Sequence, residues 1–209
     1  MNEAANFIRL LARSDTERAV GVMSSAFRND PLWQYLVPDD GRRAILLKKF
    51  FSVMLGLAIS NNQAYGISEP LNGISIGSAP TQNRTKLPIT TVVDAAKLLF
   101  IPFLISFFRS LRIFTRFEAM QKKYAPKPHY YLTSIGVLPE FQGQGLASTL
   151  IRPFLKRADE EHVSVYTETM TPSNVPLYNH YGFQSMEEFK VPKTDLRVWA
   201  LYRPNKISL

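Results

Sequence analysis

The sequence has no cysteine and no long apolar run, and these two absences exclude several classes of protein. Without cysteine the chain forms no disulfide, binds no metal through thiolates and has no cysteine nucleophile. The longest uninterrupted apolar run, Leu98 to Ile105, is far shorter than the roughly 18 to 20 residues that cross a bilayer. Arg9 and Arg13 interrupt the first apolar stretch, so no secretory signal is recognisable. We expect a cytoplasmic protein without a transmembrane segment.

The composition is that of a folded chain with a basic surface. Hydrophobic residues make up 45% of the sequence and charged residues 20%, which excludes disorder for most of the chain. We expect the 209 residues to form a single domain, 1–209. A net charge of +8 favours a polyanionic partner, such as a phosphate-rich cofactor or an anionic membrane surface. Because no motif for reading nucleic acid is present, we expect no nucleic-acid partner.

Strand-like and helix-like patterns alternate along the chain, which predicts an α/β fold. Ser14 to Glu17 has the spacing of a capping box, and Asn29-Asp30-Pro31 predicts the end of the helix that follows it. The predicted helices are 14–29, 42–60, 146–161 and 175–181. The predicted strands are 7–11, 63–68, 73–79, 130–137, 163–169, 183–191 and 196–202.

The segment from about 90 to 124 is predicted to be a helical insertion that starts or kinks at Pro102. Its helical spacing places an apolar face opposite a basic face. The apolar face is Phe103, Phe107, Leu111 and Phe114, and the basic face is Arg109, Arg112 and Arg116. A basic face is most often solvated, but the amphipathic helix 103–117 also suits an anionic membrane surface. The apolar face suits an acceptor pocket or a subunit interface.

The most informative stretch is Ile135 to Ala147, in which a buried strand is followed by a glycine-containing loop and a helix start. Glycines allow the backbone to approach a ligand closely, and the first amides of a helix are unpaired at the positive end of its dipole. This arrangement suits a pyrophosphate. The spacing is neither that of a Walker A loop nor that of a G-x-G-x-x-G dinucleotide loop.

Gln142-x-x-Gly145-x-Ala147 resembles the Q/R-x-x-G-x-G/A loop of the GNAT N-acetyltransferases. The strand end Ile135-Gly136-Val137-x-Pro139 and the segment Asn174 to Phe183 also resemble that family. So does Ala26-Phe27-x-x-Asp30-Pro31. The resemblance implies a GNAT-like α/β (α+β) domain with a mixed, mostly antiparallel central sheet. It also implies a V-shaped splay between strands 4 and 5, helices on both faces, and the additional helical insertion.

The resemblance further implies that acetyl-CoA is a co-substrate. Its pyrophosphate would lie on the amides of the glycine loop, and its pantetheine arm would pair with the strand before that loop. Asn174 would hydrogen-bond the cofactor from the opposite side. The implied cofactor-binding residues are Ile135, Gly136, Val137, Gln142, Gly143, Gln144, Gly145, Leu146, Ala147, Ser148 and Asn174.

In the same resemblance Tyr178 occupies the position of the acid that protonates the departing thiolate, and a phenol with pKa near 10 suits that task. The incoming amine must lose a proton. Glu168, at the end of strand 163–169, is the first candidate base, with His129 and Glu140 as fallbacks and ordered water as a further route. No histidine has metal-ligand spacing, so no metal site is predicted.

These observations predict an N-acetyltransferase in which a primary amine, on a small molecule or a peptide, attacks acetyl-CoA directly in a ternary complex. The acceptor and the preferred acyl length are not readable from the sequence, and a monomer and a homodimer both remain open. Two other readings stay open. One is a non-catalytic acyl-CoA sensor or adaptor, and the other is a peripheral membrane protein that uses helix 103–117.

Overall fold

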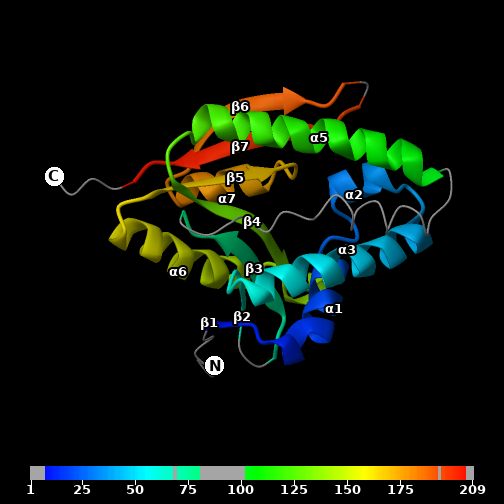
Figure 1. Cartoon of the computed structure of the whole chain (residues 1–209), viewed down its shortest axis with the longest axis horizontal. Coiled ribbons are helices and arrows are strands. Elements are labelled where there is room, and N and C mark those ends of the chain that lie inside the picture. The colour runs from blue at the N-terminus through cyan, green and yellow to red at the C-terminus, as the bar shows by residue number, and fades with distance from the viewer. Residues whose placement is uncertain (1–7, 68–69, 81–101, 193, 206–209) are drawn as a thin grey trace.

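The centre of the computed structural model is a seven-stranded sheet with the order β1-β2-β3-β4-β5-β7-β6 (Figure 1). β4 and β5 are parallel, and every other neighbouring pair is antiparallel. The structure describes residues 8–67, 70–80, 102–192 and 194–205, without the side chains of 102–110 and 112. The strands are β1 (Ile8–Leu10), β2 (Ala64–Ile67), β3 (Gly73–Ser78), β4 (His129–Val137), β5 (Ser164–Thr169), β6 (Gln184–Lys190) and β7 (Arg197–Arg203).

The helices lie on both faces of the sheet, so the predicted α/β fold is confirmed. The part of the predicted insertion at 90–101 lies outside the described residues, and α5 begins at Pro102, as predicted. The helices are α1 (Thr16–Ala26), α2 (Pro31–Leu36), α3 (Asp40–Ser60), α5 (Pro102–Tyr124), α6 (Leu146–Glu160) and α7 (Asn174–His180). Two short 3-10 turns are η1 (Arg13–Asp15) and η2 (Pro139–Phe141).

α2 was not predicted, because the residues that end α1 also begin α2. The Asp30 carboxylate caps α2 by accepting hydrogen bonds from the amides of Leu32 at 2.9 Å and Trp33 at 3.3 Å. Pro31 occupies the first helical turn, where its missing N–H costs nothing. Asp30-Pro31 is therefore a helix start as well as a helix stop.

The predicted capping box from Ser14 to Glu17 is wrong. A 3-10 turn precedes α1, so Asp15 rather than Ser14 stands directly before the helix, and it makes no side-chain cap to α1. Its carboxylate instead accepts hydrogen bonds from the amide of Ala12 at 2.7 Å and from the guanidinium of Arg9. This ion pair attaches β1 to the start of α1.

Each face of the sheet is covered by a different set of helices. On one face α6 and α7 pack against the sheet, with Ile151, Val165 and Tyr178 in the shared core. On the other face α1 and α3 cover one half of the sheet. α2 and α5 cover the remaining half of that face, where Ile113 of α5 packs near Tyr166 of β5. Figure 1 shows α5 running along β6 and β7.

A bulge in β4 changes which face its side chains occupy. Ile76 of β3 pairs with Ser134, but the next residue, Gly77, pairs with Leu132, so Thr133 is an extra residue in β4. Side chains that alternate along a strand switch faces at such an insertion. The side chains of β4 before the bulge and those after it therefore alternate in opposite phase between the two layers of helices.

β4 and β5 diverge immediately before the bulge. Their ladder ends at the pair Tyr131 and Tyr166, although β4 continues to Val137 and β5 to Thr169. Beyond that pair the Thr167 hydroxyl still donates to the Leu132 carbonyl at 2.8 Å. The V-shaped splay predicted between the fourth and fifth strands is confirmed.

α5 is fixed to the edge strand β6 by a cluster around Glu187. Its carboxylate pairs with Arg116 and accepts hydrogen bonds from Lys123 at 3.1 Å and from the Tyr124 hydroxyl at 2.7 Å. The Tyr124 hydrogen bond, followed by those cations, holds the pKa of Glu187 below its ordinary value. The Arg116 guanidinium also lies 4.8 Å from the centroid of the Phe189 ring.

The Arg116 side chain is 40% exposed, so it is partly solvated as expected, but its guanidinium also pairs with Glu187 of the sheet. The side chains of Arg109 and Arg112 lie outside the described residues. Within the described part of the chain, no helix combines the length and apolar character needed to cross a membrane.

Arg203 joins three elements and gives a test of what holds the sheet to α6. Its side chain is 6% exposed and forms a bidentate pair with Asp159 of α6 at 2.6 and 2.8 Å. It also donates to the Tyr181 carbonyl, just after α7, at 2.9 Å. We expect Arg203→Met to lower the free energy of unfolding by about 3 kcal/mol, measured by urea denaturation, because Asp159 would lose its partner.

The matched control is Glu160→Gln, which removes a carboxylate from an exposed pair with Lys156 on the same helix. An exposed pair contributes little, so this change should stay within about 0.5 kcal/mol of the unchanged protein. Equal effects of the two substitutions would contradict the role given to Arg203.

Candidate active site

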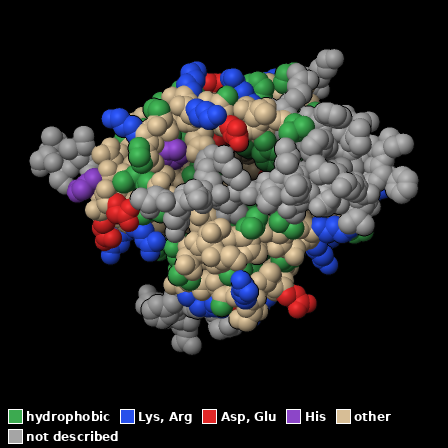
Figure 2. Space-filling model, in the orientation of Figure 1, with side chains coloured by type: hydrophobic (Ala, Val, Ile, Leu, Met, Phe, Trp, Pro, Cys, Tyr) green, Lys and Arg blue, Asp and Glu red, His purple; other side chains and the backbone are tan. Residues whose placement is uncertain are grey.

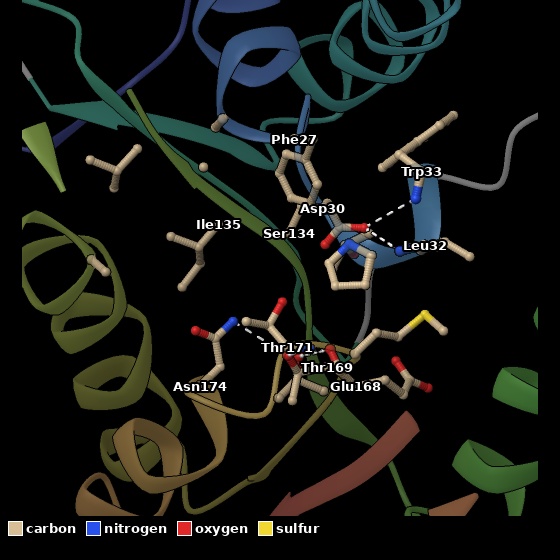
Figure 3. Close-up of a pocket in the computed structure, with 18 of the residues that line it drawn as sticks. Phe27, Asp30, Leu32, Trp33, Ser134, Ile135, Glu168, Thr169, Thr171 and Asn174 are labelled. Carbon is tan, nitrogen blue, oxygen red and sulfur yellow. Dashed lines mark hydrogen bonds between the residues drawn. The ribbon is translucent and has the colours of Figure 1, made fainter. Parts of the chain in front are cut away.

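A cleft of about 1190 Å³ opens where β4 and β5 diverge. It is lined from both sides of the sheet, by α6 and α7 on one side and by α1, α2, α3 and α5 on the other. In Figure 3, Ile135 and Asn174 lie on one side of β4, and Asp30 and Trp33 lie on the other. The cleft therefore passes through the sheet at the gap between the two strands.

The structure gathers the predicted site residues around this cleft. Among the predicted cofactor-binding residues, Gln144 alone does not line the cavity. Those that do are Ile135, Gly136, Val137, Gln142, Gly143, Gly145, Leu146, Ala147, Ser148, Glu168, Asn174 and Tyr178.

The glycine loop forms an open cradle at the start of α6. Gly143 and Gly145 have φ angles of 76° and 79°, in the left-handed region that favours glycine. A Cβ placed on either glycine would meet no heavy atom within 4 Å. No side chain caps α6 at Gly145, so the first amides of the helix face this open space without a capping acceptor. The cradle has the geometry and the partial positive charge of an anion site.

The two glutamines of the loop hold its shape rather than extend into the cradle. The Gln142 amide donates to the Val137 carbonyl at 3.0 Å, and the Gln144 amide donates to the Glu140 carbonyl at 3.2 Å. Both bonds connect the loop to the strand end and turn that precede it. They give these two residues a structural role that the motif alone does not reveal.

Ser148 lies in the first turn of α6, where its hydroxyl oxygen already has two donors. It accepts a hydrogen bond from the Tyr181 hydroxyl at 2.5 Å and another from Arg152 Nε at 2.9 Å. These contacts connect the cradle to the residue that follows α7. The rim of the cradle is thus fixed by side chains from two elements.

Gly136 is required by packing against α1. A Cβ at this position would lie 2.6 Å from the Sδ atom of Met23 and 3.2 Å from the Ala26 Cβ, so only glycine lets α1 pack this closely. The flanking residues Ile135 and Val137 contact the α6 layer instead. Because β5 has already diverged, this stretch of β4 borders the cleft along the side away from β3.

Tyr178 enters the cleft from the α6–α7 side and is buried. Its ring packs edge-on against Phe183 with 5.3 Å between centroids. Burial raises the pKa of Tyr178 to about 12, and the neighbouring Thr167 hydroxyl offsets part of that rise. The expectation of a pKa near 10 is therefore wrong, since the phenolate would be poorly solvated at this position. Tyr178 stays protonated at every neutral or moderately alkaline pH.

Glu168 reaches the cleft from the opposite face of the sheet. It accepts a hydrogen bond at 2.7 Å from the hydroxyl of Tyr131, which belongs to the core under α2 and α5. On the α7 side, Asn174 donates to the Thr169 hydroxyl at 3.3 Å. Tyr178 and Glu168 thus approach the same gap from its two sides.

The fallback bases do not line the cleft. The His129 ring is held by the Lys127 carbonyl at 2.8 Å and lies 2.5 Å from the Gln121 amide nitrogen, at the start of β4. Glu140 is exposed on the turn η2. Nowhere in the described residues do three metal-ligating acidic or histidine side chains cluster.

Several residues on the α2–α5 side of the cleft were not predicted. Tyr131 and Glu118 carry no motif, and their positions depend on which elements cover the sheet. Asp30 was predicted as part of a helix stop, and both Asp30 and Trp33 line the cleft. Phe114 of the predicted apolar face also lines it, in agreement with the acceptor-pocket interpretation of that face.

Comparison with known proteins shows what the chain is similar to. Residues 109–183, which contain the cradle, β5, α7 and Tyr178, match the model of the Acetyltransferase (GNAT) family. This confirms the resemblance to the GNAT acetyltransferases. A relative from Schizosaccharomyces pombe, described as an uncharacterized N-acetyltransferase, is 23% identical over 197 residues, covering 88% of this chain and 76% of that protein.

Solved structures show the same GNAT fold over almost the whole chain. A protein of Corynebacterium glutamicum, described as histone acetyltransferase HPA2 and related acetyltransferase, superimposes with a TM-score of 0.67 at 17% identity. That match covers 96% of this chain and 97% of the other. Arylalkylamine N-acetyltransferase 2 of Aedes aegypti superimposes with a TM-score of 0.65 at 12% identity, covering 96% and 99%.

The raised pKa of Tyr178 predicts a pH-dependent stability. The folded state binds this proton more tightly than the unfolded chain, whose tyrosine has a pKa near 10. The resulting stabilisation is complete below about pH 10 and is lost as the pH rises toward about 12. We expect the free energy of unfolding of the wild type to fall, relative to Tyr178→Phe, between about pH 10 and about pH 12. Urea denaturation at a series of pH values measures this, and a constant difference over that range would contradict the assignment.

Proposed function

We propose that this chain transfers an acetyl group from acetyl-CoA to a primary amine, by direct attack within a ternary complex. The observation that supports this most is the cleft through the sheet, which has an anion cradle on one side and carboxylates on the other. A phosphate-bearing donor and a cationic acceptor would enter such a cleft from opposite sides. The predicted cytoplasmic location stays a prediction.

The residues of the donor side fit coenzyme A. The left-handed glycines leave open space beside unpaired helix amides, which suits a diphosphate. The edge of β4 along Ile135 to Val137 borders the cleft without a neighbouring strand and suits an amide-bearing arm that pairs as a strand does. The bound donor would supply an acyl group activated as a thioester.

Figure 2 shows Lys and Arg side chains distributed over the visible face rather than collected in one patch. On that face, the net charge of +8 therefore does not form a continuous basic patch that could bind a polyanion. This favours a local phosphate cradle over nucleic-acid binding as the use of the positive charge.

The proposed chemistry requires that the sulfur gain a proton and that the amine lose one, and we propose one residue for each of these transfers. The amine nitrogen attacks the thioester carbonyl carbon, the carbon–sulfur bond breaks, and the sulfur leaves as a thiolate. Tyr178 donates a hydrogen bond and then its proton to that sulfur, while Glu168 accepts a proton from the amine. The products are an amide and a free thiol, and the remaining proton passes to solvent.

The high pKa of Tyr178 constrains how its proton moves. A thiol such as that of cysteine has a pKa near 8.5, so full transfer from a phenol with a pKa of about 12 is uphill. Transfer therefore requires that the phenolate regain a proton in the same event, supplied by the amine. Before that transfer the phenol stabilises the developing thiolate as a hydrogen-bond donor.

A coupled assay of thiol release from acetyl-CoA with a library of primary amines tests the proposal. Turnover with a defined amine, and an acetylated product of the expected mass, would support it. Coenzyme A binding without turnover of any amine would favour the sensor or adaptor instead.

Tyr178→Phe separates the acid role from binding. We expect kcat to fall about 10² to 10⁴-fold, because the leaving thiolate loses its donor. The affinity for coenzyme A, measured by calorimetry, should change little, since the ring and its packing on Phe183 are retained. An unchanged kcat across the pH range would remove Tyr178 from this role.

Gly145→Glu tests the cradle, with Gly145→Gln as a matched control of equal bulk and equal backbone strain. Both side chains enter the open space at a left-handed residue, but only glutamate adds a negative charge there. We expect coenzyme A to bind Gly145→Glu at least about tenfold more weakly than Gly145→Gln, with a difference that shrinks at high salt. Equal affinities of the two variants would place the diphosphate elsewhere.

A further inference from the structure

The acceptor side of the cleft is acidic although the protein is basic. The chain has a net charge of +8, yet the charged side chains among the described residues of the cleft are three carboxylates and one lysine. The carboxylates are Asp30 of α2, Glu118 of α5 and Glu168 of β5, and the lysine is Lys49 of α3. Because Lys49 and Glu118 are exposed, Asp30 and Glu168 are the charges nearest the interior of the cleft. A cation is favoured here and an anion is disfavoured.

Asp30 is held rigidly and faces the cleft. One of its carboxylate oxygens accepts both α2 amides, which fixes the side chain at the start of the helix. Figure 3 shows it beside Phe27 and Ser134, on the side of β4 away from Asn174. No lysine or arginine among the described residues forms a salt bridge with it. Burial raises the pKa of Asp30, so this carboxylate gains from a cationic ligand.

Aromatic rings make up much of the same side. They come from α1, α2, α3, α5 and β4, and they surround the carboxylates with apolar surface. Phe114 packs edge-on against Phe117 with 5.9 Å between ring centroids, and it is 44% exposed, so part of its ring can contact a ligand. The rings that line the cleft here are Phe27, Trp33, Phe50, Phe51, Phe114, Phe117 and Tyr131.

We propose that the acceptor is a primary amine with one ammonium group on a short linker to an aromatic ring, and that Asp30 selects the cation. The ring would pack among the aromatic side chains while the ammonium lies between Asp30 and Glu168. A free amino acid is disfavoured because its carboxylate would face three others. A linear diamine is disfavoured because its second ammonium would be desolvated among the rings.

This inference rests on the proposed function and names the acceptor class for the same site. The test measures kcat/KM at saturating acetyl-CoA for 2-phenylethylamine, butylamine, putrescine and phenylalanine. We expect 2-phenylethylamine to exceed each of the others by about tenfold or more, the effect of burying one aromatic ring or avoiding one misplaced charge. Equal or better turnover of butylamine, putrescine or phenylalanine would overturn the proposal.

Asp30→Asn tests the selecting residue, because asparagine caps a helix as well as aspartate does. We expect KM for 2-phenylethylamine to rise about tenfold or more, with little change in kcat or in coenzyme A affinity. Inhibition by the neutral analogue 2-phenylethanol should be unchanged. Glu160→Gln, which removes the same charge at the far end of α6, controls for net charge and should leave both constants unchanged. Equal weakening of amine and alcohol would show a merely structural effect and overturn the role of Asp30.

Direct binding distinguishes failure of this inference from failure of the proposed function. Saturation-transfer NMR can report binding of 2-phenylethylamine to the protein without turnover. Binding that depends on Asp30, with no acetylation of any amine, would support the ligand class and overturn the enzymatic function. Turnover of other amines, with no binding of 2-phenylethylamine, would overturn the ligand class and leave the enzymatic function standing.

Discussion

The end of pairing between β4 and β5 is the constraint on which the candidate site depends. Adjacent parallel strands ordinarily continue to exchange hydrogen bonds along their length, and a gap leaves peptide groups without partners. Here the ladder stops at Tyr131 and Tyr166 while both strands continue. The sheet survives this because β3 holds the free half of β4 and β7 holds β5. The gap is thus a binding surface built from ordinary backbone, supported on both sides.

The gap also separates two chemical environments within one cleft. The α6–α7 side presents unpaired amides, left-handed glycines and a buried phenol, whereas the α2–α5 side presents carboxylates among aromatic rings. Tyr178 of α7 and Glu168 of β5 both line this cleft, although they belong to different layers of the structure. Two reactants of opposite charge can therefore occupy the same opening without competing for the same groups. The sheet itself keeps the sites apart.

The donor side could be predicted from sequence because its parts are close together in the chain. The stretch from Ile135 to Ala147 contains a strand end, a loop and a helix start, and local chemistry determines each of them. The acceptor side could not, since it is assembled from α2, α5 and β5, whose neighbours depend on the order of the strands. Asp30 illustrates the difficulty, because the segment Asn29-Asp30-Pro31 follows the end of α1 and also begins α2. Arg116 illustrates it again, since its partner Glu187 is 71 residues away.

The cluster around Glu187 has a consequence for how acceptor preference can change. α5 provides one wall of the acceptor side, and it rests on β6, the outermost strand of the sheet. Among the described residues, no group of the glycine loop or α6 takes part in that attachment. Substitutions on β6 can therefore change the tilt of α5 and leave the glycine loop at the start of α6 intact. If the proposed function holds, divergence toward new acceptors needs no change in the half of the molecule that we propose receives the donor.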